Sequence, residues 1–419
     1  MFIPRGSIRH NLFFDFYNLI VTSLNTRLLN GVSTKLDYET NSEIEKIFYP
    51  YNSNLMPYAR TCLYCLIKSL DIKKGSEILM TPFNIYPMIN VIESFGLKVK
   101  FIDINLHDFG PNYSDLDEYL SKKPSFFLLT YLFGYVPNLD LIVDTCKKYN
   151  VPLIEDFSQA IGAKYKNKLL GTFGFASFYS ASLTKYVDGY NGAFILKNNF
   201  DKDNNIQNYL RKFNKPDKKR LRSIIFKTFI WNCASNRYFF NVFTFPILYI
   251  LRILNRKLFN KLLGAQISFN KEKKLPKYYF ENISEIQAKT INKFLKKLPH
   301  LLSERRRCFE RFESAYLEIT KNMGVRRNIE IQNLNNYKGN VYWQMVIKVS
   351  NTKVAQDILF SWGVETGITN LPNLAKEYKI GLPNANSLKK NYIFMPLHDF
   401  LKTKDYKKLI FRLIKAKQI

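Results

Sequence analysis

The chain has 419 residues, 46% of them hydrophobic, which is enough for two or three domains with buried cores. Its formal net charge of +29 favours anionic partners, namely phosphates, nucleic acid or an anionic membrane surface. No zinc finger, RRM signature or basic zipper accompanies this charge, so nucleic acid is the least expected partner. The first residues lack the order of a signal peptide, and five cysteines form no disulfide framework, so we expect a cytoplasmic protein.

The first 200 residues predict an arm followed by an α/β domain. Residues 1–55 are expected to form an N-terminal arm with one or two helices. Residues 56–200 alternate between helical and strand patterns of apolar residues. Helices are predicted over 61–70, 87–95 and 139–149, and strands over 77–80, 98–102, 126–131, 151–155, 175–179 and 193–196. This alternation predicts a large α/β domain, with a mostly parallel sheet sandwiched by helices. Ligands of such sheets bind beyond the carboxyl ends of the strands, where Thr81, Tyr131 and Asp156 are expected.

Residues 201–277 interrupt the alternation and are interpreted as a basic helical insertion. They contain 18 Lys and Arg against 4 Asp and Glu, and two apolar stretches at 224–231 and 238–251. The second stretch contains Pro246 and is shorter than the roughly 20 residues that a bilayer span requires. We therefore predict amphipathic helices. Two interpretations stay open: the helices contact an anionic membrane surface, or they pack on the protein body or across a dimer.

Residues 278–419 predict a small C-terminal α+β domain. A helix is expected from 283 through 298, a second helix over 305–319, a strand at 341–349, and helices over 353–362 and 404–415. Upstream, Cys62 and Cys65 form a CxxC without a second pair of ligands, which favours a buried helix face over a zinc site.

One pair of residues indicates a chemistry. An apolar strand ends at Asp156, and about thirty residues later Lys185 follows a hydroxyl-rich turn, as a pyridoxal phosphate enzyme requires. In such an enzyme the lysine forms a Schiff base with the cofactor aldehyde, and the carboxylate keeps the pyridine nitrogen protonated. Taken singly, Lys185 is equally a solvated charge and Asp156 a helix N-cap.

The rest of the cofactor also has candidate partners. Ala59, Arg60 and Thr61 open a predicted helix, whose first amides suit a phosphate, and Ser180 lies five residues before Lys185. Tyr86 is a candidate for stacking on the cofactor ring, although ordinary packing also explains one of 27 tyrosines.

The order of these segments resembles the DegT/StrS-type sugar aminotransferases, which are pyridoxal phosphate enzymes of fold type I. IEDFSQA at 154–160 resembles the family's IEDAAQA, and the segment 171–185 resembles its GSLGDAGCFSFYPTK. Further resemblances are ARTCLY at 59–64, KGSEILMTP at 74–82, FIDI at 101–104, YLFG at 131–134, ISEIQA at 283–288 and GVETG at 363–367.

The resemblance implies a role for each candidate residue. Lys185 would hold pyridoxal 5'-phosphate, Asp156 and Gln159 would contact its ring, and Tyr86 would stack on it. Ser180 and the Ala59–Thr61 segment would bind its phosphate. It also implies a homodimer that transfers an amino group, with glutamate as the expected donor, to a nucleotide-linked keto-sugar for surface polysaccharide or lipopolysaccharide synthesis. Family members that act as dehydratases have histidine in place of the lysine, so Lys185 favours transamination.

Some positions depart from the family pattern. Tyr131 replaces a histidine, Phe175 replaces an aspartate, and Tyr190-Asn191 replaces a segment with an acid. These departures leave open that the chain is a catalytically degenerate member of the fold that acts as a binding partner or regulator. The basic charge leaves open a second alternative, an α/β protein that binds membranes peripherally or nucleic acid.

Overall fold

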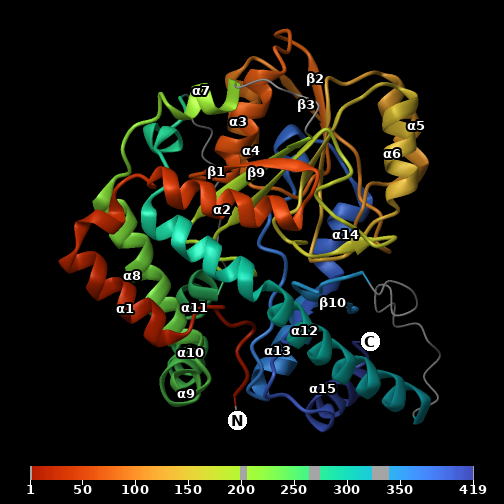
Figure 1. Ribbon diagram of the computed structural model, residues 1–419. Helices are drawn as coiled ribbons and strands as arrows, with labels where there is room; N and C mark the ends of the chain where they lie inside the picture. Colours follow the sequence, from red (N-terminus) through yellow and green to blue (C-terminus); the bar gives the residue numbers. More distant parts are fainter. Residues whose placement is uncertain (1, 199–204, 264–273, 323–338, 419) are drawn as a thin grey trace.

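The computed structural model describes residues 2–198, 205–263, 274–322 and 339–418, and a seven-stranded sheet lies at its centre (Figure 1). The strand order is β1-β9-β8-β5-β4-β2-β3. All neighbours from β8 to β3 pair in parallel, whereas β9 is antiparallel to both of its neighbours. The bounds are β1 (Tyr51–Met56), β2 (Glu77–Met80), β3 (Lys98–Phe101), β4 (Phe127–Thr130), β5 (Leu153–Asp156), β8 (Ala176–Ala181) and β9 (Gly192–Asn198). The predicted mostly parallel sheet is confirmed.

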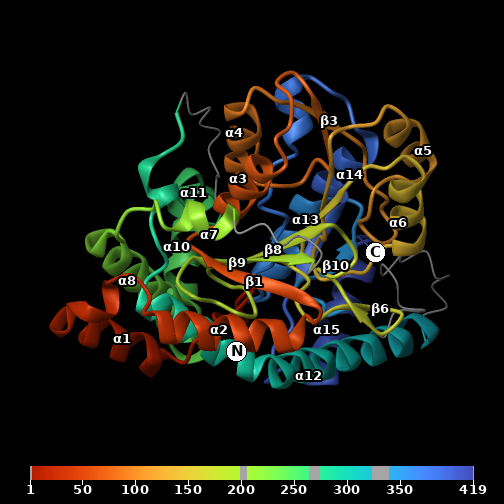
Figure 2. The ribbon, with the colours of Figure 1, turned by 45° about the horizontal axis from the view of Figure 1, so that its top comes forward.

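Helices cover both faces of this sheet (Figure 2). Every residue of β4 and β5 is buried, as expected of strands without a solvent-facing side. One face packs on α3 (Ala59–Ser69) and α4 (Tyr86–Ser94). The other face packs on α2 (Thr34–Ile47), α5 (Tyr113–Ser121), α6 (Leu139–Lys148) and the first half of α12 (Glu285–Asn322). The sandwich of helices predicted from the alternating pattern is therefore confirmed.

The strand register gathers the sequence-predicted residues along one edge of the sheet. Asp156 at the end of β5 pairs with Phe178 of β8, and Ser180 pairs with Ala193 of β9. Ala193 pairs in turn with Met56, the last residue of β1. Because β1 therefore runs parallel to β8, the helix that follows it, α3, begins at the same edge as Asp156 and Ser180.

The N-terminal residues contribute a strand as well as helices. They form α1 (Leu12–Leu24), the short η1 (Thr26–Leu29), α2 and then β1. The predicted arm over 1–55 contains the expected helices, but most of β1 also falls within it and is an edge strand of the large sheet. The sequence of β1, YNSNLM, contains several polar residues, because an edge strand alternates between buried and exposed positions. Such a sequence lacks the apolar pattern from which the other strands were predicted.

The insertion is helical wherever the structure describes it. It contains α7 (Asn205–Leu210), α8 (Lys218–Ser235), α9 (Arg237–Phe239), the π-helical turn η2 (Phe240–Thr244), α10 (Phe245–Leu254) and α11 (Arg256–Leu263). Helix α8 packs along α1 (Figure 1). The predicted helices at 224–231 and 238–251 both exist, while 201–204 and 264–273 of the predicted insertion lie outside the described residues.

The C-terminal region packs two strands and several helices against α12. Its elements are η3 (Lys277–Phe280), α12, β10 (Met345–Lys348), α13 (Thr352–Ser361), η4 (Leu374–Tyr378), α14 (Pro383–Asn391), β11 (Tyr392–Met395) and α15 (Thr403–Lys415). A short hairpin, β6 (Lys164–Tyr165) with β7 (Lys168–Leu169), lies apart from the main sheet.

One prediction about this region is wrong. Two helices were expected over 283–319, but α12 continues through Pro299 as one helix. A proline inside a helix costs about 3 kcal/mol. Leu295 and Leu298 before it pack on the sheet, and Phe309 and Phe312 after it pack in the other core cluster. Burial of both halves therefore outweighs the local cost.

Candidate active site

Asp156 is a buried carboxylate in the middle of the sheet edge. Its Oδ1 accepts the backbone N–H of Ser158 at 3.1 Å, and its Oδ2 accepts the side-chain amide of Asn84 at 3.2 Å. Asn84 also donates to Thr130 on the neighbouring strand. Burial raises the pKa of Asp156, and the bonds from Ser158, the nearby Lys185 charge and Asn84 oppose that rise. The alternative of a helix N-cap does not hold for Asp156, because residues 158–162 form a turn and no helix begins there.

Lys185 reaches the same place from the turn after β8. Its backbone N–H donates to Ser182 at 3.1 Å, and Thr184 before it adopts a left-handed conformation with φ of 72°. Burial lowers the pKa of Lys185 to about 8, although the Asp156 and Asp188 charges oppose this shift. Such an amine is neutral far more often near physiological pH than an ordinary lysine, and the neutral form is the one that acts as a nucleophile or accepts a proton.

The amine of Lys185 lies against an aromatic ring from the C-terminal region. Its Nζ is 3.9 Å from the centroid of the Trp343 ring, and the Trp343 indole N–H donates to the Thr184 carbonyl at 3.0 Å. Sequence analysis did not identify Trp343, because the contact spans more than 150 residues of chain and no local motif marks it. Asn84 was also missed, although its place two residues after Pro82, just beyond a strand end, was an available signal.

The segment predicted to hold a phosphate opens α3. The Thr61 amide donates to the Tyr58 carbonyl at 3.0 Å, and the Thr61 hydroxyl donates to the Tyr279 carbonyl at 2.8 Å. The Arg60 guanidinium lies 4.2 Å from the Tyr58 ring centroid and 4.5 Å from that of Tyr279. Ala59 is buried at the first position of the helix. Thr61 therefore already has protein partners, which leaves the amides of Ala59 and Arg60 as the anion-binding candidates.

Two unpaired polar atoms fit a bound cofactor at this edge. Among the described residues, Arg60 Nε and Thr81 Oγ1 are buried and have no hydrogen-bond partner. Buried polar groups are rarely left unsatisfied, so each is suited to a group that the protein itself does not supply. A cation at the start of α3 and a hydroxyl at the end of β2 match an anionic cofactor with polar ring substituents. The residues present therefore fit pyridoxal phosphate.

The other predicted contact residues lie around this edge with protein partners of their own. Gln159 Oε1 accepts the Phe133 amide at 2.7 Å, and the Ser180 amide donates to the Ser158 hydroxyl at 3.0 Å. The Tyr86 hydroxyl donates to Glu377 in the C-terminal region at 2.8 Å. Burial, followed by the bond to Glu377, raises the pKa of Tyr86 to about 12. Tyr86 thus connects two regions of the chain, and its stacking role stays a prediction.

The Tyr131 departure has a structural partner. The Tyr131 hydroxyl donates to Glu155 at 2.6 Å. The buried Glu155 carboxylate also accepts three backbone amides from the 171–174 turn, at 2.6 to 2.8 Å. Tyr131 therefore fixes the turn that leads into β8 and the Lys185 segment. Phe175, which stands where the family has an aspartate, is partly buried and packs against the core.

The Tyr190-Asn191 segment faces α1. Both residues have positive φ, at 52° and 73°. The Tyr190 hydroxyl donates to the buried Asp15 of α1 at 2.7 Å and accepts from Asn18 at 2.9 Å. His10 Nδ1 lies 2.6 Å from the Asp15 carboxylate, and His10 Nε2 lies 3.0 Å from the Asp188 carbonyl; protonated His10 donates to both. A buried polar network, comprising His10, Asp15, Asn18, Asp188 and Tyr190, therefore joins α1 to the loop after Lys185.

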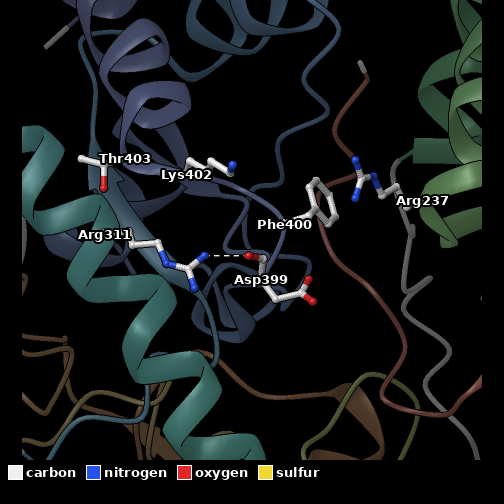
Figure 3. Close-up of a pocket in the computed structure, with 6 residues that line it drawn as sticks. All are labelled: Arg237, Arg311, Asp399, Phe400, Lys402 and Thr403. Atoms are coloured by element: carbon white, nitrogen blue, oxygen red, sulfur yellow. Dashed lines mark hydrogen bonds between the residues drawn. The ribbon is translucent and has the colours of Figure 1, made fainter.

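Two surface cavities lie apart from Lys185 and Asp156. One, of about 660 Å³, is lined by Arg237, Arg311, Asp399, Phe400, Lys402 and Thr403 (Figure 3). There Arg311 donates to the Asp399 carbonyl at 2.6 Å, and the Arg237 guanidinium lies 4.8 Å from the Phe400 ring centroid. The second, of about 300 Å³, is lined by Gly162, Lys164, Leu302, Ser303, Arg306, Gly339, Asn340 and Val341.

The cysteines take the expected place in the core. Cys62 and Cys65 are buried in α3, as predicted for a helix face, and burial raises the pKa of Cys65 to about 12. Within the described residues, no cluster of three or more His, Cys, Asp or Glu side chains is arranged to bind a metal ion.

Comparison with known proteins agrees with this geometry. Residues 59–225 match the DegT/DnrJ/EryC1/StrS aminotransferase family. A GDP-perosamine synthase of Escherichia coli O157:H7 is 27% identical over 151 residues, 35% of this chain and 42% of that protein. The UDP-4-amino-4,6-dideoxy-N-acetyl-beta-L-altrosamine transaminase of Campylobacter jejuni (serotype O:23/36) is 31% identical over 144 residues, 34% of this chain and 38% of that protein. Each match thus spans less than half of the curated relative.

Solved structures resemble the whole chain. An aminotransferase from Psychrobacter cryohalolentis superposes with a TM-score of 0.71 at 15% identity, over 99% of this chain and 98% of that one. The E. coli GDP-4-keto-6-deoxy-D-mannose-3-dehydratase with bound hydrated PLP gives 0.70 at 19% identity, over 99% and 100%. The chain therefore has the fold of pyridoxal phosphate-dependent aminotransferases.

Proposed function

Because residues 59–225 match the DegT/DnrJ/EryC1/StrS aminotransferase family, we propose that this protein is a pyridoxal phosphate-dependent aminotransferase. It moves an amino group, with glutamate as the donor, to a nucleotide-linked keto-sugar. Relatives named as a GDP-perosamine synthase and a sugar transaminase support this substrate class. The product feeds surface polysaccharide or lipopolysaccharide synthesis.

The observation that carries this proposal is the approach of Lys185 and Asp156. Asp156 ends β5, Lys185 lies in the turn that follows the neighbouring parallel strand β8, and each charge shifts the pKa of the other. When bound, pyridoxal phosphate supplies an aldehyde and an electron-withdrawing ring that stabilises negative charge on an adjacent carbon. Asp156 would keep the ring nitrogen protonated. Because this carboxylate is buried, where the dielectric constant is lower than in water, its attraction for the protonated nitrogen would be stronger.

Lys185 would serve as the proton carrier. With a pKa of about 8, its Nζ accepts a proton and returns it near neutral pH without a large energetic penalty in either direction. The centroid of the Trp343 ring lies 3.9 Å from that nitrogen, and the ring covers one side of it. Arg60 and the first amides of α3 would bind the phosphate, together with Ser180, while Gln159 holds the 131–134 turn in place.

The proposal also includes an oligomeric state and a cellular location. We expect a homodimer in the cytoplasm that contacts an anionic membrane surface through residues 201–277. The basic excess of that segment, 18 cationic against 4 anionic side chains, supports the contact.

The test is amino transfer by the purified protein. With pyridoxal phosphate and glutamate, a panel of nucleotide-linked keto-sugars should yield one product in which an amine replaces the carbonyl oxygen, detected by mass spectrometry. Lys185→Ala should abolish it, and Asp156→Asn should bind the cofactor but slow turnover by about 100-fold or more. Cofactor binding without any transfer, to sugars or to simple keto acids, would contradict the proposal and favour a binding partner or regulator.

A further inference from the structure

Helix α1 has its polar side inside and its apolar side outside. Asp15, Asn18 and Thr22 are its buried residues. Large apolar residues on the same helix face solvent, with exposed fractions of 80% for Phe13 and 82% for Leu24. A surface helix of a soluble domain normally has the reverse arrangement, with the apolar stripe against the core. The outer side of α1 is therefore built for an apolar neighbour.

The helical run from α9 to α10 also exposes an apolar side. Its inner side, with Phe240, Phe245 and Leu248, packs on Phe360 and other core residues. Its outer side carries no charge between Arg237 and Arg252, and its exposed residues there are Tyr238, Phe239, Val242, Phe243, Ile247, Tyr249 and Ile250. By length and composition, Arg237–Leu254 is an apolar helix of 18 residues with a mean hydropathy of 1.3, only 17% of it buried.

These helices form one concentrated apolar surface. Helix α8 lies between α1 and η2, contacts both, and exposes Phe226, Ile230 and Trp231 (Figures 1 and 2). Among the described residues, 18 of the 25 exposed large hydrophobic side chains lie on α1, α8, α9, η2, α10 or α11. Scattered apolar residues need no explanation, but such a concentration marks an interaction surface. We call the outer sides of α1, α8 and α9 to α10 the apolar face.

The charge around the apolar face decides its partner. Arg27, Lys227, Arg237 and Lys257 are exposed on or next to its helices. A second copy of this chain, also with a charge of +29, would bring like charges together around the contact. An anionic lipid surface instead attracts cationic side chains and accepts apolar ones, and Trp and Tyr side chains favour its interfacial depth.

We propose that the apolar face inserts into one leaflet of an anionic membrane, with the α9 to α10 run lying in the membrane plane. The inner side of that run stays packed on the protein body, because the Phe245 ring lies 4.9 Å from the Phe360 ring, centroid to centroid. The protein thus lies on the membrane and does not cross it. The proposal extends the membrane contact of the insertion to α1, and it stands independently of the cofactor site.

Vesicle flotation tests the proposal with the full-length protein. Vesicles of equal parts phosphatidylcholine and phosphatidylglycerol should float most of the protein, phosphatidylcholine alone should float much less, and added salt should release it. Ile247→Glu with Ile253→Glu should lower recovery by more than about tenfold, since both side chains are exposed on the apolar face. Leu141→Glu, at an exposed apolar site on α6, is the control and should float like the unmodified protein.

Trp231 provides a second readout. Its fluorescence should shift to the blue on vesicle binding, and Trp231→Phe should remove that shift without abolishing flotation. Equal recovery of the Ile247→Glu, Ile253→Glu double variant and the unmodified protein would overturn the proposal. So would absence of flotation combined with a dimer that the double variant dissociates, because that result assigns the apolar face to a second copy. Unchanged pyridoxal phosphate binding by the double variant separates either outcome from failure of the proposed enzyme.

Discussion

At the residue scale, the environment of the Lys185 amine is the most informative feature. Burial lowers its pKa to about 8, whereas Asp156 and Asp188 act in the opposite direction. An exposed lysine keeps a pKa near 10.4. The neutral amine is the form that attacks an aldehyde, so the pH at which Lys185 becomes reactive reports its burial.

The first prediction follows from that pKa. The rate at which the cofactor-free protein binds pyridoxal phosphate should rise with pH, with a midpoint near 8, and then level off. Asp156→Asn removes a charge that raises the pKa of Lys185, so the midpoint should move to lower pH. Stopped-flow absorbance measures the rate of cofactor binding by the unmodified protein and by the Asp156→Asn variant. A rate that keeps rising beyond pH 9 would show that the amine is exposed.

The sequence located the reacting pair but not its surroundings. Asp156 and Lys185 were visible because each follows a recognisable strand or turn, and a parallel sheet gathers such ends at one edge. Trp343 was invisible, since its ring reaches Lys185 from a distant segment. The partner of Tyr131 was also hidden: the sequence showed an unusual residue, but only the fold places Glu155 against its hydroxyl.

At the element scale, the buried polar network holds α1 to the loop after Lys185. Burial by itself would lower the pKa of His10, but the Asp188 and Asp15 carboxylates outweigh it and the net pKa is raised. A raised pKa in the folded state means that protonated His10 stabilises the fold. That contribution is full below the unfolded pKa of about 6.5 and disappears as pH rises through the folded value.

The second prediction concerns this pH dependence. His10→Gln should lower the free energy of unfolding by about 3 kcal/mol at pH 6, because it leaves two buried carboxylates without a cation. The deficit should shrink as pH rises above the folded pKa of His10. Urea unfolding from pH 6 to 9 measures it, and a deficit that stays constant over this range would mean that His10 is neutral in the fold.

The third prediction concerns the turn before β8. A Cβ added at Gly174 would lie 2.3 Å from the Leu153 carbonyl oxygen, and the backbone cannot move aside as a flexible side chain would. Gly174→Ala should therefore destabilise the protein by about 2 to 4 kcal/mol. Gly6→Ala is the matched control, since nothing lies within 4 Å of its added Cβ, and it should change stability by less than about 0.5 kcal/mol. Equal melting temperatures of the two variants would contradict this packing.

Elements with a strong local pattern were predictable, and those that tertiary packing decides were not. The buried strands of the sheet and the helices between them follow from their apolar patterns. In contrast, α12 passes through Pro299 because both of its halves are buried, and β1 exists because β9 offers it a partner. Neither cause is visible in the local sequence.

At the scale of the whole molecule, the fold separates the candidate active site from the surface proposed to bind a membrane. The candidate active site lies at the carboxyl edge of the central sheet, whereas the apolar face belongs to α1 and the insertion. The network from Asp15 to Tyr190 is a direct connection between them, since it joins α1 to the loop that follows Lys185. Helix α1 is the element that the two regions share.

The fourth prediction concerns assembly. Sedimentation in detergent-free buffer should give a homodimer, with twice the 49.4 kDa mass of one chain. The Ile247→Glu, Ile253→Glu double variant should stay dimeric, because the apolar face is assigned to the membrane and not to the dimer contact. A monomer in the unmodified protein would contradict the proposed assembly without affecting the chemistry at Lys185.

The central claim is that the Lys185 amine binds the aldehyde of pyridoxal phosphate opposite Asp156. The most direct measurement is borohydride reduction of the protein after incubation with the cofactor, followed by peptide mass spectrometry. We predict that the cofactor mass appears on the peptide that contains Lys185, at one per chain, and that Lys185→Arg eliminates it while leaving the melting temperature unchanged. Labelling distributed over the many surface lysines, with none favoured at position 185, would contradict the account.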